Sequence, residues 1–372
     1  AFRLQGQQAA AKDQFEQALH VAHTVENAPG KSELLYDVEC SATMLLGAFE
    51  ADWGNNHAAR QQMGQGLQLA QTLGKRRMQT TLLINMADIA RNMGAYPAAR
   101  QEYEEAIRLT RQIDFRWGEG VGQLELGDVV RKQGEYSYAA QLMTNAYTLL
   151  QEIGEHGKTA LALTWLGRLY AYMGDSTAAE AWLTRYQQVT EQVRGWEAEI
   201  DYYQARTVLA WQRGELTQAL AYATQGWQIG QSRSLPDVQA YALIGTGHAQ
   251  RQLGQLTAAA SAYQQALALY TTIQRPDLAT EAMAGVAAIA QQQGDQALHL
   301  VDALLGQLTE QPTVGLDEPF FLYLTCYQIL VAANDPRATA LLQQGHRLLQ
   351  QYADQITSDT LRRSFWENVP IH

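Results

Sequence analysis

The segment MGAYPAARQEYEEA, residues 93–106, recurs in outline as LGQLTAAASAYQQA at residues 253–266. Each copy has a glycine after an apolar residue and then alanine, tyrosine and alanine five, nine and twelve residues further on. The leading glycine recurs every 40 residues, at Gly54, Gly94, Gly134, Gly174, Gly214, Gly254 and Gly294. A fixed period of this length indicates a stacked repeat array, in which each unit packs on its neighbours. The 372-residue chain is therefore predicted to be a solenoid.

Small residues also stand seven positions before the turn glycine, at Gly47, Ala87, Gly127, Gly167 and Gly247. Small residues on both sides of the turn let two antiparallel helices approach closely, and the larger residue nine positions after the glycine fills the space beside them. Glycine at the turn can adopt the left-handed conformation that ends the first helix. The abundance of Ala, Gln and Leu favours helix throughout. The pattern predicts an all-α fold of helix–turn–helix units.

This register of small residue, turn glycine, alanine, aromatic residue and alanine resembles the tetratricopeptide repeat. The resemblance implies a right-handed superhelical solenoid of antiparallel helix pairs, about eight to nine units in all, with the array covering residues 1–308. The family's usual unit has about 34 residues, so we expect the longer unit to extend each helix by nearly a turn, as in long-helix variants found in bacterial regulators. The register departs from the family pattern at Tyr186, Arg206, Thr207 and His299, where we expect differences in local packing.

The register begins near the N-terminus, at Gly6, and the spacing from Gly6 to Gly54 is 48 residues. This places an eight-residue insertion around Glu26–Glu33. Because the chain opens just before Gly6, the first helix of its first unit is missing. We therefore expect the sequence to be a fragment of a longer polypeptide.

After Gly294 the period stops, and residues 309–372 are expected to form a linker, a variant helix pair and a capping tail. Thr309–Glu318 contains proline and glycine and is predicted to be the linker. Phe320–Ala333 and Pro336–Tyr352 are predicted to be the helix pair, because Asp335 can cap and Pro336 can start the second helix.

A short helix, Ser358–Trp366, is predicted before the C-terminal tail. The closing stretch RRSFWENVPIH, residues 362–372, resembles the end of long bacterial signalling proteins of the maltose-regulator type, the signal-transduction ATPases with numerous domains (STAND). In that family a tetratricopeptide array follows an ATPase module. We expect Phe365 and Trp366 to cap the open face of the last helix pair.

The charge balance, −11 from 38 acidic and 27 basic residues, argues against a nucleic-acid surface, which needs a concentrated basic patch. The two cysteines, Cys40 and Cys326, are far apart in sequence, and we expect reduced thiols in the core. No apolar run approaches the roughly 20 residues that span a bilayer, and the N-terminus lacks a signal-peptide pattern. We therefore expect no membrane contact and a cytoplasmic location.

The sequence shows no catalytic or metal-binding pattern such as HExxH, CxxC or GxSxG. Gly30-Lys31-Ser32 resembles the end of a phosphate-binding loop, but Val25 stands where that motif needs glycine, so we interpret the stretch as a polar loop. No histidine forms a metal-ligand pair with a carboxylate partner at helical spacing. We expect no enzyme activity, no cofactor and no metal site.

The candidate site is the concave surface of the array. In tetratricopeptide arrays the first helix of each unit lines this groove, with positions three, six and nine before the turn glycine pointing inward. In the middle units these positions and their neighbours mix charged, amide and aromatic side chains. The predicted ligand-binding residues are Asn85, Asp88, Arg91, Asn92, Glu125, Asp128, Arg131, Lys132, Trp165, Arg168, Tyr172, Trp211, Gln212, Tyr241, His248 and Arg251.

Two interpretations of these residues stay open at this point. In one, Asp88–Arg91 and Asp128–Arg131 are ion pairs on solvated helix faces, worth about a few tenths of a kcal/mol each. In the other, the arginines and the aromatic residues form a recognition groove for a peptide or a small molecule. Arginine suits bidentate contact with carboxylates or phosphates, and Trp and Tyr offer stacking surfaces.

Three functions follow from the two interpretations and from the resemblance. The preferred hypothesis is a non-catalytic sensor and interaction domain of a larger bacterial signalling protein, in which a protein, peptide or small-molecule inducer biases the curvature of the array. The second is a constitutive scaffold that docks peptides or protein termini without switching. The third is an enzyme on a helical scaffold, against which the absence of a nucleophile–base set counts.

Overall fold

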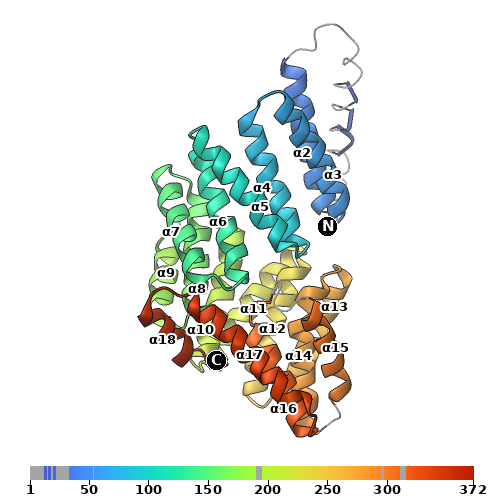
Figure 1. Cartoon of the computed structure of the whole chain (residues 1–372), viewed down its shortest axis with the longest axis vertical. Helices are drawn as coiled ribbons and strands as arrows, with labels where there is room; N and C mark the ends of the chain where they lie inside the picture. Colours follow the sequence, from blue (N-terminus) through green and yellow to red (C-terminus); the bar gives the residue numbers. More distant parts are fainter. Residues whose placement is uncertain are drawn as a thin grey trace. The chain divides into compact units, whose positions relative to one another are not determined.

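The computed structural model describes residues 12–14, 16–17, 20–21, 33–52, 54–189, 195–294, 297–310 and 316–372. These residues are helical in all their regular elements and contain no strand, so the all-α prediction is confirmed. The elements, labelled as in Figure 1, are α2 (Glu33–Asp52), α3 (Asn56–Thr72), α4 (Arg76–Asn92), α5 (Tyr96–Gln112), α6 (Arg116–Lys132), α7 (Tyr136–Glu152), α8 (His156–Tyr172), α9 (Ser176–Val189), α10 (Trp196–Gln212), α11 (Leu216–Arg233), α12 (Pro236–Gln252), α13 (Leu256–Thr272), α14 (Pro276–Gln293), α15 (Leu298–Glu310), α16 (Pro319–Ala332), α17 (Arg337–Asp354) and α18 (Asp359–Glu367).

The 40-residue period corresponds to one pair of helices. Helices α4 to α8 are each 17 residues long, and three residues connect each helix to the next. Two such helices and two such connections make one unit. The length beyond the usual repeat therefore lies in both helices, as the sequence predicts.

The turn glycines end the first helix of each pair. At Gly94, φ is 75°; its amide donates to the carbonyl of Arg91 at 2.9 Å, and the amide of Ala95 donates to the carbonyl of Ala90 at 2.9 Å. These two bonds form a Schellman motif, which satisfies carbonyls that the helix leaves without partners. The predicted left-handed turn is confirmed.

A second series of left-handed residues lies halfway between the turn glycines. It ends the second helix of each pair and includes residues other than glycine. Its members are Gly74 (φ 67°), Asp114 (50°), Gly154 (74°), Ser234 (59°) and Gln274 (56°). The backbone therefore repeats every 20 residues, although the glycine pattern in the sequence repeats every 40.

Close packing inside each helix pair explains the small residues. A Cβ atom added at the glycine seven before the turn would lie 2.6 Å from the side chain nine after it, in the pairs Gly47–Met63, Gly167–Leu183 and Gly247–Tyr263. The alanines five after the turn have no exposed surface; they are Ala59, Ala99, Ala139, Ala179, Ala219 and Ala259. These contacts confirm the close approach predicted from the register.

The described chain forms two compact units, Ala1–Val129 (unit 1) and Val130–His372 (unit 2). In unit 2 the first helices of successive pairs, α8, α10, α12 and α14, pack on one another. Thirteen of the 17 residues of α8 are buried, against three of the 14 in its partner α9. The first helices therefore form an inner layer, and the second helices form an outer one.

Helix α16 takes the place of the next inner helix, because it packs on both α14 and α15. The chain then returns through α17 and α18 (Figure 1) to earlier helices of unit 2. Phe365 of α18 is fully buried, with its ring 5.7 Å from that of Tyr136 at the start of α7. We expected Phe365 and Trp366 to cap the last pair. Trp366 does lie beside His346 of α17, with ring centroids 6.0 Å apart, whereas Phe365 joins the tail to α7.

Other sequence expectations concern single residues. Cys40 and Cys326 are buried free thiols, as predicted, and burial raises the pKa of Cys326 to about 12. None of the described helices is long and apolar enough to cross a membrane. Gly6, Gly30-Lys31-Ser32 and all of the predicted insertion except Glu33 lie outside the described residues.

Candidate functional site

In unit 1 the predicted groove residues form an ion-pair network around Arg91. Its guanidinium lies 2.6 Å from Glu125, 3.5 Å from Asp88 and 3.9 Å from Asp128. The hydroxyl of Tyr103, nine residues after the turn glycine, donates to Asp88. Burial, reinforced by Asp88, raises the pKa of Tyr103 well above its usual value, so the phenol stays protonated as the donor. The sequence-based ion pair Asp88–Arg91 is present, but the shorter contact runs to the next inner helix.

The predicted residues Asn85 and Asn92 contribute differently. Asn92 is exposed and Asn85 is half-buried. Neither side chain bonds to the Arg91 network in the described part of the chain.

In unit 2 a carboxylate that was not predicted lies among the predicted residues. Asp317 precedes α16, and it accepts a hydrogen bond from Arg131 Nη1 at 2.8 Å and from Lys132 Nζ at 3.4 Å. The Arg131 guanidinium also lies over the ring of Tyr172, 5.3 Å from its centroid. The Tyr172 hydroxyl is 3.3 Å from that of Tyr241. The structure thus brings four predicted residues together around one acidic side chain.

Arg168 is held by the next inner helix in the same way as Arg91. Its Nη1 atom lies 3.0 Å from Asp201 and donates to Gln204 at 2.7 Å, both on α10. Trp165 and Trp211 are 7 % and 6 % exposed, and neither indole N–H has an acceptor among the described residues. The amide nitrogen of Gln212 is also buried without an acceptor there. A bound water or an acceptor group of a ligand would satisfy these donors.

His248 and Arg251 surround Phe321 of α16. The His248 ring lies 4.6 Å from that of Phe321, and the Arg251 guanidinium lies 5.3 Å from the same ring centroid. His248 Nδ1 is 2.8 Å from the Tyr263 hydroxyl, and His248 Nε2 is 3.1 Å from Glu281 Oε1 on α14. His248 stands six residues before its turn glycine, as Asp88 does. In both repeats a tyrosine of the second helix forms a hydrogen bond with the residue at this position.

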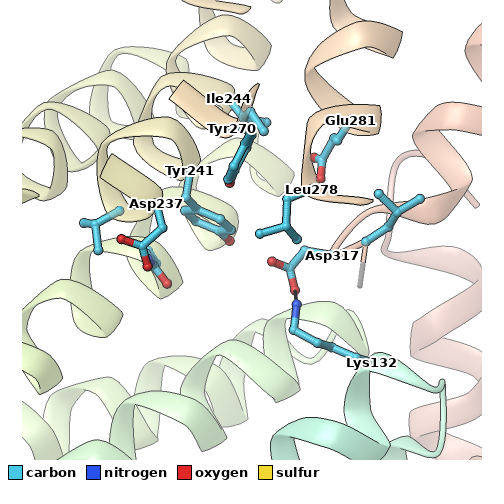
Figure 2. Close-up of a pocket in the computed structure, with 11 residues that line it drawn as sticks. Lys132, Asp237, Tyr241, Ile244, Tyr270, Leu278, Glu281 and Asp317 are labelled. Carbon is cyan, nitrogen blue, oxygen red and sulfur yellow. Dashed lines mark hydrogen bonds and ion pairs between the residues drawn. The ribbon is translucent and has the colours of Figure 1, made fainter. Parts of the chain in front are cut away.

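A cavity of about 140 Å³ opens beside Asp317 on the inner helices of unit 2. Figure 2 shows Asp237, Tyr241, Tyr270, Glu281 and Asp317 around it, with Lys132 reaching Asp317 from α6. The side chains that line it come from α6, α10, α12, α13, α14 and the segment before α16. They are Lys132, Gln204, Asp237, Val238, Tyr241, Ile244, Tyr270, Leu278, Glu281, Leu316 and Asp317.

Of the predicted residues, Lys132 and Tyr241 line this cavity, and Arg131, Tyr172, Arg168 and His248 contact residues that do. Sequence reasoning missed Gln204, Asp237 and Glu281, which stand ten, seventeen and thirteen residues before their turn glycines. These positions continue the same helix face away from the turn, so a longer column along that face would have found them. Nothing in the repeat pattern indicates Asp317.

Burial and neighbouring carboxylates raise the pKa values of several groups around the cavity. Burial, reinforced by Asp317, raises the pKa of Tyr241, and burial with Glu281 and Asp317 raises that of Tyr270. Glu318 is buried as well, and burial together with Glu281 and Asp317 raises its pKa well above the usual range. Its Oε1 atom has no donor among the described residues. These groups therefore favour their neutral forms.

The described residues hold no cluster of three or more His, Cys, Asp or Glu side chains positioned to bind a metal ion. Arg91, Arg131 and Arg168 pair with carboxylates of the chain itself, whereas Arg251 lies over the Phe321 ring. The cavity itself is lined by charged, hydrogen-bonding and apolar groups.

Comparison with known proteins supports the repeat. A tetratricopeptide repeat model matches residues 80–113 and 238–272. The first match covers most of α4 and α5 in unit 1, and the second covers most of α12 and α13 in unit 2. A comparison with curated proteins gave no match.

The chain also resembles several solved structures at low identity. A Rap protein complexed with Competence and Sporulation Factor is 13 % identical over 89 % of this chain and 96 % of its own, with a TM-score of 0.54. A tetratricopeptide repeat protein from Parabacteroides merdae is 16 % identical over 77 % of this chain and 98 % of its own, with a TM-score of 0.46. A STAND protein with a tetratricopeptide repeat sensor from Pyrococcus horikoshii is 12 % identical over 87 % of this chain and 55 % of its own, with a TM-score of 0.37.

The likeness to the Rap protein shows a common fold, and the two lower scores carry no further weight. The matched repeats and the helix pairs of the described residues agree with the register read from the sequence. The chain therefore contains tetratricopeptide repeats at residues 80–113 and 238–272, and its described helices have the fold of a tetratricopeptide-like helical solenoid.

Proposed function

We propose that the chain is a non-catalytic interaction domain that binds a peptide segment of a partner on the inner helix layer of unit 2. The observation that carries this proposal is the cavity formed by the successive inner helices α10, α12 and α14. Its volume of about 140 Å³ is close to that of an engineered cavity of about 150 Å³ that holds a benzene molecule. The cavity therefore accepts one side chain of a ligand, and the adjoining inner helices offer a surface for the rest.

The lining supports binding rather than mere packing. It combines apolar walls, such as Ile244 and Leu278, with a few convergent polar groups, such as Gln204 and Asp237. This mixture is typical of ligand sites. The Rap protein that shares this fold was crystallised in complex with a separate factor, which is consistent with the proposal.

The same cavity supports a sensor role in a signalling protein of the STAND type. Leu316 and Asp317 line it, and they lead directly into α16 and then into the returning helices α17 and α18. A ligand that contacts Leu316 or moves Asp317 away from Arg131 would change the packing of these helices. Such a ligand shifts the equilibrium only by the difference between its affinities for the two arrangements.

Selection of peptides on the whole chain tests the binding proposal. Random peptides are selected on the wild-type chain and then measured against Leu278→Trp, which fills the cavity, and against Leu342→Trp on the exposed face of α17 (Leu342 is 47 % exposed). We expect the selected peptides to lose about tenfold or more in affinity for Leu278→Trp and to bind Leu342→Trp unchanged. Peptides that bind both variants equally, or a selection that yields none, would overturn the proposal.

Hydrogen exchange separates the sensor from the scaffold. If the domain is a sensor, a bound peptide changes the exchange protection of α17 and α18 as well as that of α12 and α14. A constitutive scaffold gains protection at the inner helices only. The second result would overturn the sensor role and leave the binding proposal intact.

A further inference from the structure

The cavity of unit 2 has an excess of acidic groups. Among its lining residues, Asp237, Glu281 and Asp317 are acidic and Lys132 is basic. The Lys132 ammonium lies 3.4 Å from Asp317, a carboxylate that Arg131 also contacts. Glu281 lies 3.1 Å from His248 Nε2, so an anion entering the cavity would meet Asp237 as the lining carboxylate that has no ion pair among the described residues.

The arginines that the sequence offers to an anionic ligand are engaged in the same way. Arg131 lies 2.8 Å from Asp317, and Arg168 lies 3.0 Å from Asp201. Drawing either arginine away from its carboxylate toward an anion would break a largely buried ion pair, which is unfavourable. These pairs therefore disfavour an anion at this place.

The walls of the cavity suit a long cationic side chain. Ile244, Leu278 and Leu316 supply apolar surface, against which the methylene groups of lysine or arginine can lie. Tyr241 and Tyr270 supply aromatic rings, and a cation over such a ring is attracted to its face. Asp237 is exposed, so a cation that it contacts keeps part of its hydration.

The raised pKa values of the lining tyrosines agree with this charge distribution. For Tyr270, Glu281, Asp317 and Asp237 all add to the effect of burial. The acidic residues around Tyr270 thus act in the same direction as its burial.

We propose that the cavity binds the cationic side chain of an arginine or a lysine in a peptide ligand. The inference rests on the proposed function, because it specifies which side chain enters the peptide-binding cavity. Asp237 contacts the cationic group, which lies against the rings of Tyr241 and Tyr270. Ile244, Leu278 and Leu316 contact the methylene groups of the side chain.

Three capped tripeptides test the charge requirement on the whole chain. They are Ac-Ala-Arg-Ala-NH2, the same peptide with citrulline, which has the shape of arginine without its charge, and the same peptide with glutamate. Binding is followed by NMR through the Ile244 methyl group. We expect the arginine peptide to bind about tenfold more tightly than the citrulline peptide and the glutamate peptide to be the weakest.

Matched variants assign the effect to Asp237. Asp237 and Asp277 both follow a proline at the start of an inner helix, but Asp277 pairs with Arg275 at 2.7 Å and does not line the cavity. We expect Asp237→Asn to weaken binding of the arginine peptide about fivefold or more and Asp277→Asn to leave it unchanged. Both substitutions remove a negative charge from the first turn of an inner helix, but only Asp237 lines the cavity.

Equal binding of arginine and citrulline peptides, tighter binding of the glutamate peptide, no binding of any of them, or equal effects of the two variants would overturn the cation site. The cation site and the proposed peptide-binding function can be contradicted by different results. Selected peptides that depend on Leu278 but contain no basic residue would contradict the cation site and support the peptide groove. Tripeptide binding that Leu278→Trp does not affect would contradict both.

Discussion

Two groups of turns in unit 2 have the same glycine and the same backbone conformation but different surroundings. At Gly214, Gly254 and Gly294, φ lies between 73° and 83°, and nothing lies within 4 Å of an added Cβ atom. At Gly134, φ is also 83°, but an added Cβ atom would lie 2.4 Å from the Tyr352 ring. At Gly174 it would lie 2.5 Å from the carbonyl oxygen of Ser364.

The second group of turns is covered by the returning C-terminal helices. Ser364 Oγ donates to the Gly174 carbonyl at 2.8 Å, and Asn368 Nδ2 donates to it at 3.2 Å. The amide of Thr357 donates to Ser137 Oγ at 3.0 Å. The open turns thus need glycine for backbone conformation alone, whereas the covered turns need it also for close packing. A periodic sequence can therefore hide two different requirements behind one residue.

Substituting alanine for glycine at one open and one covered turn should give the largest effect, because the two variants should lose different amounts of stability. Both Gly254→Ala and Gly134→Ala force a side chain into the left-handed region, which costs about 1–2 kcal/mol. Gly134→Ala also displaces the Tyr352 ring, and overpacking of this kind costs about 1–3 kcal/mol more. Thermal and denaturant unfolding of both variants measure the difference.

A Tyr352→Ala background provides the control for that comparison. With the ring absent, the additional cost at Gly134 should disappear, because the coupling comes from the one contact. If Gly134→Ala and Gly254→Ala destabilise the chain equally in the wild-type background, the covered turn does not depend on close packing.

The C-terminal tail that covers these turns should contribute less to the stability of the fold at acidic pH, because of His372. Burial lowers the pKa of His372 to about 4, although its Nδ1–H bond to the Phe365 carbonyl opposes the shift. The unfolded chain takes up this proton near pH 6.5 and the folded chain does not, so the stability from neutral His372 falls as the pH drops from about 6.5 to 4. Unfolding measured across this range in wild type and His372→Gln should show a shallower slope in the variant.

His156→Gln serves as the matched substitution, since His156 is exposed at the start of α8. It measures the general effect of replacing a histidine by glutamine at an exposed position. Equal slopes for wild type and His372→Gln would show that protonation of His372 does not govern the tail.

The smallest effect concerns the left-handed residues that are not glycine. Gln274 has a φ of 56°, and Gln274→Gly should stabilise the chain by about 1 kcal/mol by removing the strain of its Cβ atom. The melting temperature should rise by about 2 °C. The reverse substitution Gly74→Gln, at a turn with nothing within 4 Å of an added Cβ atom, should lower it by a similar amount; a rise there would contradict the strain argument.

The sequence predicts the repeat unit well because its determinants are local. Gly47 and Met63 lie on the two helices of one pair, and the contact between them follows from their spacing alone. The 20-residue repetition of left-handed turns was missed because Asp114, Ser234 and Gln274 adopt it without being glycine. Tertiary packing imposes that conformation where the residue type does not indicate it.

The candidate site was predicted only in part, because it combines local and distant segments. Tyr241, thirteen residues before its turn glycine, was identified, but Glu281 at the same position of the next repeat was not, and neither was Asp237, seventeen residues before its glycine. The contact between Arg131 and Asp317 joins residues 186 positions apart, and it depends on how many units stack before the chain returns. No spacing rule within one repeat contains that information.

Ion pairs between successive inner helices mean that one repeat of this array cannot replace another. Arg91 lies against Glu125, Arg168 against Asp201 and His248 against Glu281, and each pair joins one unit to the next. The position of Asp201 and Glu281, thirteen before the turn glycine, is occupied in α12 by Tyr241. If a recombination event removed residues 175–214, it would keep the period intact and would set Arg168 against that tyrosine. The backbone of each repeat is the same, but the ion pairs between inner helices fit only one order of the repeats.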